Sequence, residues 1–176
     1  SISMLLAGGS PSPANFKDLP PFRRDRPRAG ADWGFLKKLR GEWKGNLIVK
    51  GVLDPEDAKK IKETGVDAIY VSGHGARQLD SLPAPITQLP KIRKAVGKNF
   101  PLIFDTGVRN GEDIVKAYAS GADFVMLGRP VLYALGADGE RGLKTIMNYI
   151  SKEIQVTLAQ IGLAKISEVN EKNLIR

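Results

Sequence analysis

The sequence contains no cysteine among its 176 residues, and it contains only one histidine. The absence of cysteine excludes a disulfide framework and thiolate metal sites, and a single histidine argues against a histidine-based metal centre, so we expect no metal. No apolar run approaches the roughly 18 residues that a membrane-spanning helix needs. Residues 1–12 also lack the basic leader of a signal peptide. These absences favour a cytoplasmic protein, with a peripheral position on the inner face of the membrane as the second choice.

Charge is abundant and unbalanced, with 27 lysines and arginines against 19 acidic residues and a net charge of +8. Such a charge attracts nucleic acid, an anionic membrane surface or small anionic ligands. The basic residues are scattered rather than interleaved with aromatic residues. We therefore rank small anionic ligands first and a membrane surface second, and we expect no nucleic-acid partner.

Two regions differ in composition. Residues 1–34 contain a Gly-Gly pair, several prolines and four clustered arginines, which predicts a long basic loop or arm without regular structure. Residues 35–176 are long enough for one domain with a substantial core. In this second region short apolar runs alternate with helical patterns. Strands are predicted at 47–49, 68–71, 102–104 and 124–127, and helices at 35–41, 54–64, 89–96, 111–120 and 143–161.

Continuous apolar strands that alternate with helices are typical of a parallel sheet covered by helices, an α/β fold. The turn Gly65-Val66-Asp67 precedes the second strand, and Gly121-Ala122-Asp123 precedes the fourth. The same turn before two strands indicates a repeating βα unit.

Each predicted strand is followed by glycine or charged residues, at 50–51, 72–80, 105–111 and 128–130. In a (β/α) barrel the active site is built from these carboxyl ends. Histidine exchanges protons readily near neutral pH, and arginine can grip a carboxylate through two hydrogen bonds. His74, Arg77 and Asp80 therefore read together as a base, a carboxylate clamp and an orienting acid, although a lone His-Gly would be an ordinary turn.

The last two strand ends resemble an anion site. Gly107 and Gly111 would leave backbone amides free near the start of a helix, and Arg109 and Arg129 would add two guanidinium groups. Lys50 would direct a positive charge into the same space. Taken alone, these motifs are equally compatible with tight turns that carry exposed arginines.

In combination, these four strand ends resemble the FMN-dependent 2-hydroxy acid dehydrogenase and oxidase family, which includes glycolate oxidase, L-lactate dehydrogenase and mandelate dehydrogenase. The resemblance implies a (β/α)8 TIM-barrel fold, of which residues 35–176 would form about the last four βα units and a closing C-terminal helix. It implies that His74 removes a proton from a small L-2-hydroxy acid, partnered by Asp80, and that Arg77 grips the substrate carboxylate. It also implies FMN as cofactor, bound by Lys50, Ser72, Asp105, Gly107, Arg109, Gly128 and Arg129.

Two departures from the family bear on function. Gly73 stands where the family usually has asparagine, which could loosen the histidine turn. The resemblance also covers only the second half of the family's barrel, so we expect a homo-oligomer or completion by an N-terminal half. Residues 1–34 would then correspond to a loop that contacts the membrane in some relatives.

Two alternatives remain open. One is a non-catalytic half-barrel that binds phosphate or flavin or requires a partner chain. The other is an unrelated phosphate-binding barrel, which is disfavoured because the grouping of His74, Arg77 and Asp80 would then be a coincidence.

Overall fold

A computed structural model describes residues 31–77 and 79–174. The chain divides into two units between Phe35 and Leu36. Of the first unit the structure describes residues 31–35, so most of the basic arm expected at 1–34 lies outside the described residues. The second unit carries the sheet and all of the predicted site residues.

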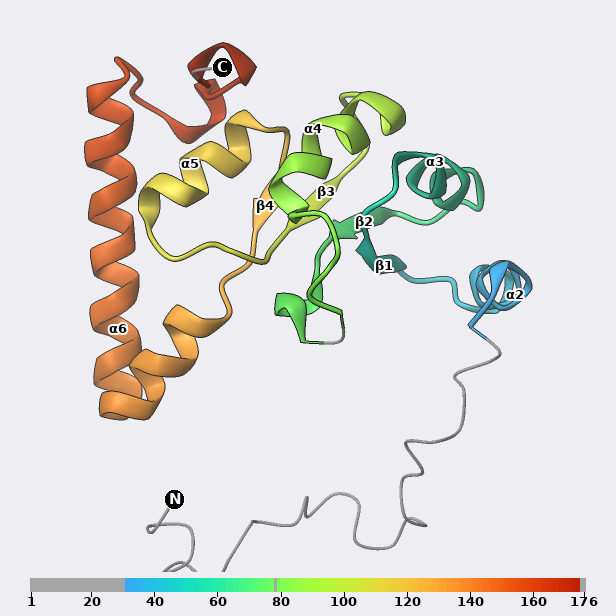
Figure 1. The fold of residues 1–176 in the computed structure, drawn as a ribbon, viewed down its shortest axis with the longest axis horizontal. Helices are drawn as coiled ribbons and strands as arrows, with labels where there is room; N and C mark the ends of the chain where they lie inside the picture. The colour runs from blue at the N-terminus through green and yellow to red at the C-terminus, as the bar shows by residue number, and fades with distance from the viewer. Residues whose placement is uncertain (1–30, 78, 175–176) are drawn as a thin grey trace, which may run out of the picture. The chain divides into compact units, whose positions relative to one another are not determined.

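The second unit is built on one parallel sheet whose strands are adjacent in chain order (Figure 1). The strands are β1 (Ile48–Val52), β2 (Ala68–Val71), β3 (Leu102–Phe104) and β4 (Phe124–Val125). The helices are α2 (Trp33–Glu42), α3 (Pro55–Glu63), α4 (Pro85–Val96), α5 (Gly111–Ala119) and α6 (Arg129–Gln160). A parallel sheet whose strands follow one another through helices confirms the α/β class and is part of a (β/α) barrel.

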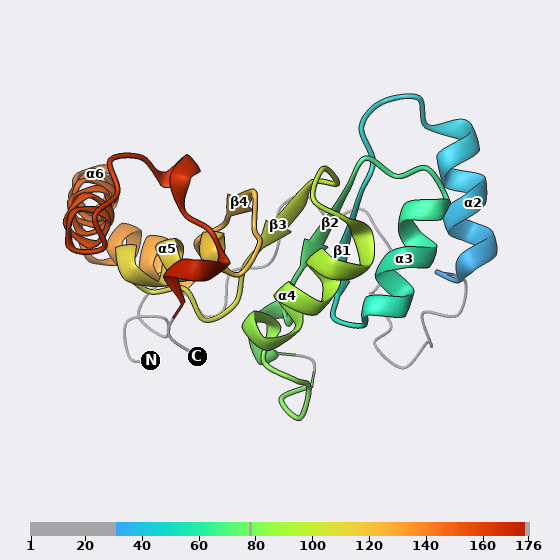
Figure 2. The same cartoon turned by 90° about the horizontal axis from the view of Figure 1, so that it is seen from above.

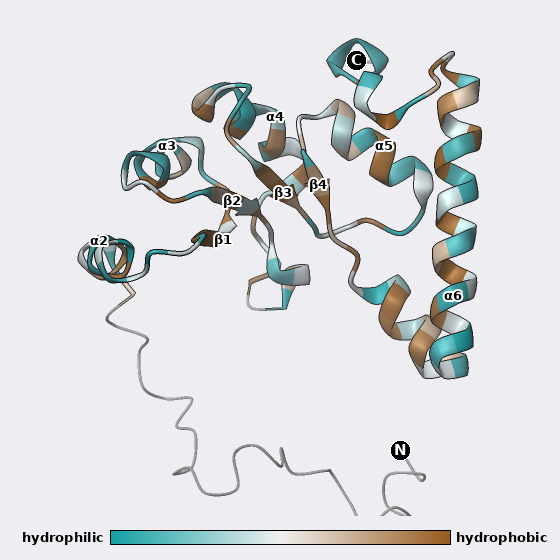
Figure 3. Cartoon of the chain, turned by 180° about the vertical axis from the view of Figure 1, so that it is seen from behind, coloured by the Kyte–Doolittle hydropathy of each residue, from teal (hydrophilic) through white to brown (hydrophobic). Residues whose placement is uncertain are grey.

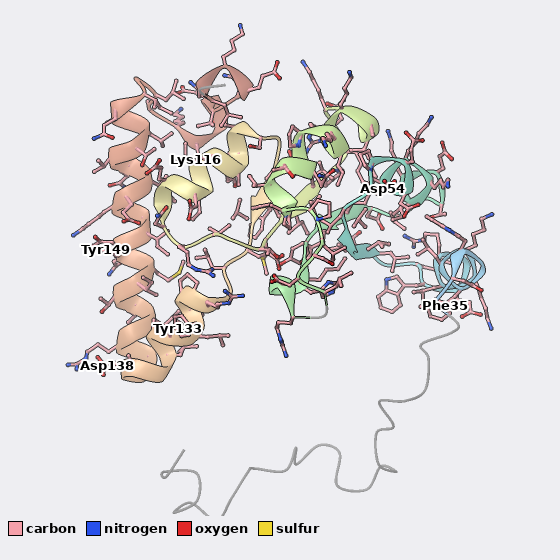
Figure 4. The ribbon with its side chains drawn as sticks, in the orientation of Figure 1. Phe35, Asp54, Lys116, Tyr133, Asp138 and Tyr149 are labelled. Carbon is pink, nitrogen blue, oxygen red and sulfur yellow. The ribbon has the colours of Figure 1, made fainter. Side chains whose placement is uncertain are left out.

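Local sequence explains several element boundaries. The Asp54 side chain accepts hydrogen bonds of 2.9 Å from the backbone N–H groups of Glu56 and Asp57, and Pro55 occupies the first position of α3 (Figure 4). This cap was predicted, as were the bounds of β2 and β3. Other boundaries were wrong. β1 spans Ile48–Val52 rather than 47–49, so residues 50 and 51 lie within the strand instead of after it. α2 begins at Trp33 rather than at 35, α4 begins at Pro85 rather than at 89, and β4 ends at Val125 rather than at 127.

The C-terminal helix departs further from the prediction. It begins at Arg129, directly after β4, and bends where Asp138 and Gly139 leave the helical conformation. The bend brings the two helical segments close, since a Cβ on Gly142 would lie 2.1 Å from the carbonyl oxygen of Ala134. Tyr133 lies on the segment before the bend (Figure 4). Hydrophobic and hydrophilic bands alternate along the second segment, as the predicted apolar stripe requires (Figure 3).

The two faces of the sheet have different surroundings. Ile69 and Leu102 are paired in register and fully buried, and they join the core formed with α3, α4 and α5 (Figure 2). The opposite row runs across the sheet as Lys50, Tyr70, Ile103 and Phe124, each paired with the next. We call this row, with Ile48, the open face, because Ile48 is 48% exposed and Phe124 57% exposed.

Two arginines tie the amino ends of neighbouring strands together. Arg40 of α2 pairs with Asp67 at 2.8 Å, and the same carboxylate accepts the N–H of Leu47, just before β1. Arg93 of α4 pairs with Asp123, whose carboxylate accepts the N–H of Leu102 in β3. These arginine clasps use the aspartates of the two Gly-x-Asp turns, which gives the predicted repeat a physical basis.

We expect Arg93→Met to lower the free energy of unfolding by about 3 kcal/mol, measured by urea denaturation. The reason is that the Arg93 guanidinium also donates to the carbonyls of Gly97, Lys98, Phe100 and Gly121, which the methionine would leave without a donor. The matched control is Lys144→Met in an exposed helical pair with Glu140, for which we expect a loss of about 0.5 kcal/mol or less. Equal losses for the two variants would show that the clasp is not a major source of stability.

Candidate active site

The carboxyl ends of the strands surround one open pocket of about 460 Å³. Eight of the ten predicted site residues line it: Lys50, His74, Arg77, Asp105, Gly107, Arg109, Gly128 and Arg129. Figure 1 shows the turn after β2 and the start of α6 below the same edge of the sheet. Another hollow in the described part of the chain, between Lys62 and Phe100, contains none of these residues.

Lys50 lies at the centre of a polar network on the open face. Its Nζ donates to Ser72 Oγ at 2.7 Å and lies 3.4 Å from Asp105 Oδ2. The same ammonium group lies 4.5 Å from the centre of the Tyr70 ring, a favourable cation–π distance. Tyr70 and Lys50 are neighbours because they are register partners on β2 and β1. The network fixes a positive charge at the pocket wall.

Asp105 is held as a carboxylate at the end of β3. Burial favours its protonated form and is the largest single influence, but hydrogen bonds from Ser72, Thr106 and Tyr70 and the charge of Lys50 outweigh it and lower the Asp105 pKa. The Tyr70 hydroxyl donates to Asp105 Oδ2 at 2.9 Å, and burial together with this bond raises the Tyr70 pKa. At neutral pH the site therefore holds an anionic Asp105 beside a neutral Tyr70.

His74 lies against a bulge in β1. The register between β1 and β2 shifts between Lys50 and Val52, and Gly51 takes a φ of +92° there. A Cβ on Gly51 would lie 2.5 Å from His74 Cε1, a distance that non-bonded atoms do not reach. Glycine is therefore needed at 51 both for its backbone conformation and for the space that the imidazole occupies.

The structure does not bring all of the predicted catalytic segment together. Asp80 is exposed and does not line the pocket, and within the described residues no hydrogen bond or ion pair joins it to His74. Arg77 lines the pocket with an exposed side chain. The roles expected for Asp80 as partner of the base and for Arg77 as carboxylate clamp stay predictions.

The anion site is arranged differently from the prediction. The start of α5 is already occupied, since Asn110 caps the N–H of Asp113, Asp113 accepts from Arg109, and the Gly111 amide donates to Glu153 Oε2 at 2.8 Å. Gly111 serves packing instead, because a Cβ there would lie 2.5 Å from the backbone nitrogen of Ile154. The expected free amide at 111 was therefore wrong.

The start of α6 differs from the start of α5 because no side chain caps it. Its N-cap Gly128 makes no side-chain cap, and a Cβ on Gly107 or Gly128 would meet no atom within 4 Å. Both glycines line the pocket together with Arg109 and Arg129, and Pro130 in the first turn of α6 contributes no N–H. An uncapped helix start beside two arginines is suited to a phosphate.

These residues together fit a flavin mononucleotide. The uncapped start of α6 and two arginines suit its phosphate, the Asp105 carboxylate suits hydroxyl groups of its sugar chain, and the Lys50 ammonium suits the negative charge that the ring would gain on reduction. Comparison with known proteins supports FMN as the cofactor. Residues 9–176 match the sequence model of the FMN-dependent dehydrogenase family. The chain belongs to this family.

Three proteins similar to the chain are L-lactate or (S)-mandelate dehydrogenases. The L-lactate dehydrogenase of Caulobacter vibrioides is 45% identical over 139 residues, which cover 79% of this chain and 36% of that protein. The L-lactate dehydrogenase of Acinetobacter baylyi is 42% identical, over 81% of this chain and 37% of that protein. A soluble mutant of the membrane-associated (S)-mandelate dehydrogenase of Pseudomonas putida has a TM-score of 0.82 at 34% identity, over 98% of this chain and 52% of that one. The chain thus spans little more than a third of the two lactate dehydrogenases.

Three residues of the site escaped the sequence analysis. Tyr70 lies within a strand that looked purely structural, Gly51 looked like an ordinary strand end, and Thr106 lies between two residues that had been singled out. The alternation of strand side chains could have placed Tyr70 on the same face as Lys50, once the register was known. No local pattern signals the contacts of Gly51 and Thr106, which depend on backbone conformations at positive φ.

Proposed function

We propose that this chain supplies the general base and the flavin phosphate site of an FMN-dependent enzyme that oxidises a small L-2-hydroxy acid to the 2-oxo acid. The single observation that carries the proposal is one pocket lined by Lys50 of β1, His74 after β2 and Arg129 after β4. The lactate and mandelate dehydrogenases among its relatives support a 2-hydroxy acid as the substrate class.

Each residue of the site takes one role. His74 accepts a proton from the substrate, and Arg77 binds the substrate carboxylate at the exposed mouth of the pocket. Bound FMN would supply the electron acceptor for the oxidation. Lys50 places a positive charge at the pocket wall, the buried Ser72 hydroxyl holds the Lys50 ammonium group from behind, and Asp105 offers its carboxylate to hydroxyl donors. Gly107, Gly128, Arg109 and Arg129 hold the phosphate.

The site needs more chain than residues 36–176 provide. The open face exposes apolar side chains at both edges, Ile48 on β1 and Phe124 on β4, and free edges of this kind promote association. The relatives are more than twice as long as the matched segment. We propose that an N-terminal half barrel or a second copy of the chain covers this face, and that the isolated chain is inactive.

A peripheral contact with a membrane is the second part of this proposal. Its support is the net charge of +8 and a relative described as a monotopic membrane protein, an (S)-mandelate dehydrogenase. Among the described residues, no helix combines the length and the apolar character that crossing a membrane requires. Co-sedimentation with anionic and neutral vesicles would test this contact.

The proposed reaction is tested by supplying the missing half. The FMN-loaded chain is mixed under anaerobic conditions with a polypeptide carrying the first four βα units of the Caulobacter relative, and flavin reduction is followed after addition of L-lactate, (S)-mandelate or glycolate. We expect flavin reduction only when both polypeptides are present, and none with the D-enantiomers of lactate and mandelate. Bound flavin that no 2-hydroxy acid reduces would favour a non-catalytic module, and turnover by a monomeric chain alone would overturn the need for a second half.

A further inference from the structure

The turn that carries His74 has an unfavourable backbone conformation. His74, Gly75 and Ala76 have φ values of 52°, 66° and 62°, so three successive residues are left-handed. Only glycine adopts this region freely, and a run of left-handed residues is costly for the others. Only one of these three residues is a glycine, so bonds from other residues must hold the conformation.

The Thr106 hydroxyl accepts two of those bonds, and Ser72 Oγ accepts a third, from the His74 N–H at 3.1 Å. Thr106 Oγ1 accepts the N–H of Gly73 at 3.1 Å and the N–H of Gly75 at 3.3 Å. It donates its own proton to Asp105 Oδ1 at 2.8 Å. A hydroxyl has one proton and two lone pairs, and here all three are used within the protein. Thr106 is thus bonded to the turn on one side and to the Asp105 carboxylate on the other.

The conformation of Thr106 is itself unusual. Its φ of 76° lies in the left-handed region, which β-branched residues strongly avoid. Strain of this kind persists where surrounding structure imposes it, and it concentrates at functional sites. Gly75 is also held from the β4 side, since Arg129 Nη2 donates to its carbonyl at 2.9 Å. The turn is therefore attached to the ends of both β3 and β4.

We propose that Thr106 is a positioning residue that holds the left-handed His74 turn against the Asp105 carboxylate. The proposal rests on the proposed function, because it gives the turn a task only if His74 is the base. Thr106 lines the pocket, but its hydroxyl is fully used within the protein, so in this account it makes no hydrogen bond to substrate or cofactor. It fixes the backbone from which the imidazole projects.

Amide hydrogen exchange of the chain tests the attachment without cofactor or substrate. In Thr106→Val, which keeps the β-branched shape and lacks the hydroxyl, we expect the amides of Gly73 and Gly75 to exchange at least about tenfold faster. Thr106→Ser should retain wild-type exchange because it retains the hydroxyl. Thr145→Val, which removes a hydroxyl that donates to the Arg141 carbonyl within α6, is the matched control and should leave both amides unchanged.

Flavin reduction in the assembled enzyme tests the positioning role. We expect kcat to fall about 10–100-fold in Thr106→Val, with KM changing far less, and to recover in Thr106→Ser. If the valine variant does not fold, Thr106→Gly takes its place in both measurements, because glycine removes the hydroxyl without backbone strain. Unchanged exchange at residues 73 and 75, or faster exchange with unchanged kcat, overturns the proposal. A wild-type assembly that never reduces flavin would instead refute the proposed function, and the exchange result would still decide whether Thr106 holds the turn.

Discussion

His74→Ala is expected to slow flavin reduction by a 2-hydroxy acid about 10²–10⁴-fold while FMN remains bound. The imidazole lines the pocket, whereas most of the predicted cofactor contacts, including Lys50, Asp105 and Arg129, come from strands other than β2 or from the segments that follow them. Removal of the base therefore leaves the cofactor site intact. Stopped-flow absorbance measures the reduction, and flavin fluorescence measures the binding, both in the assembled enzyme.

A matched control and a second variant sharpen this test. Lys152→Ala changes an exposed residue on α6 and should leave both measurements unchanged. Asp80→Asn tests the unconfirmed partner of the base, and it should slow reduction only if Asp80 acts on His74. Rapid flavin reduction by the His74→Ala enzyme would remove His74 from the mechanism.

Gly51→Ala is expected to lower the rate of flavin reduction about 100-fold, because the added methyl group displaces the His74 ring. Misplacement of a catalytic group by about 1 Å has effects of this size. The added Cβ would lie 2.5 Å from His74 Cε1 and 3.3 Å from Nδ1, so the imidazole must move. The φ of +92° at position 51 adds backbone strain of about 1 kcal/mol or more.

Gly97→Ala separates the two effects of the Gly51 substitution. Gly97 has a comparable φ of +84° at the end of α4, but a Cβ there would meet no atom within 4 Å. Both alanine variants should lose similar stability on thermal denaturation, and only Gly51→Ala should lose activity. Equal activity of the two variants would show that the contact between Gly51 and the imidazole does not matter for catalysis.

The sequence predicts the strands and the strand-end chemistry better than the hydrogen bonding of the helix ends. β2 and β3 are runs of apolar residues bounded by turns, so their limits follow from composition. The anion site was placed partly at α5, whose sequence does not reveal that Glu153, 42 residues away, occupies the Gly111 amide. A contact of that kind depends on how α6 bends at Asp138 and Gly139, which local patterns do not encode.

The sequence likewise predicts some residues of the site and misses others. Lys50, His74 and Arg129 could be named because each follows a predicted strand, and the pocket brings them together. Thr106 and Gly51 could not, since their importance lies in positive φ angles and in contacts made across strands. Tyr70 required the register between β1 and β2, which places its ring beside Lys50.

The binding of FMN and riboflavin to this chain, measured by quenching of flavin fluorescence, tests the phosphate site most directly. Riboflavin lacks only the phosphate, and a charge-assisted hydrogen bond contributes about 1.5–3 kcal/mol, so we expect FMN to bind about tenfold or more tightly than riboflavin. Arg129→Ala should remove most of that difference, because Arg129 lines the pocket beside the uncapped start of α6. Equal affinity for the two flavins, or an unchanged preference for FMN in Arg129→Ala, would contradict the account.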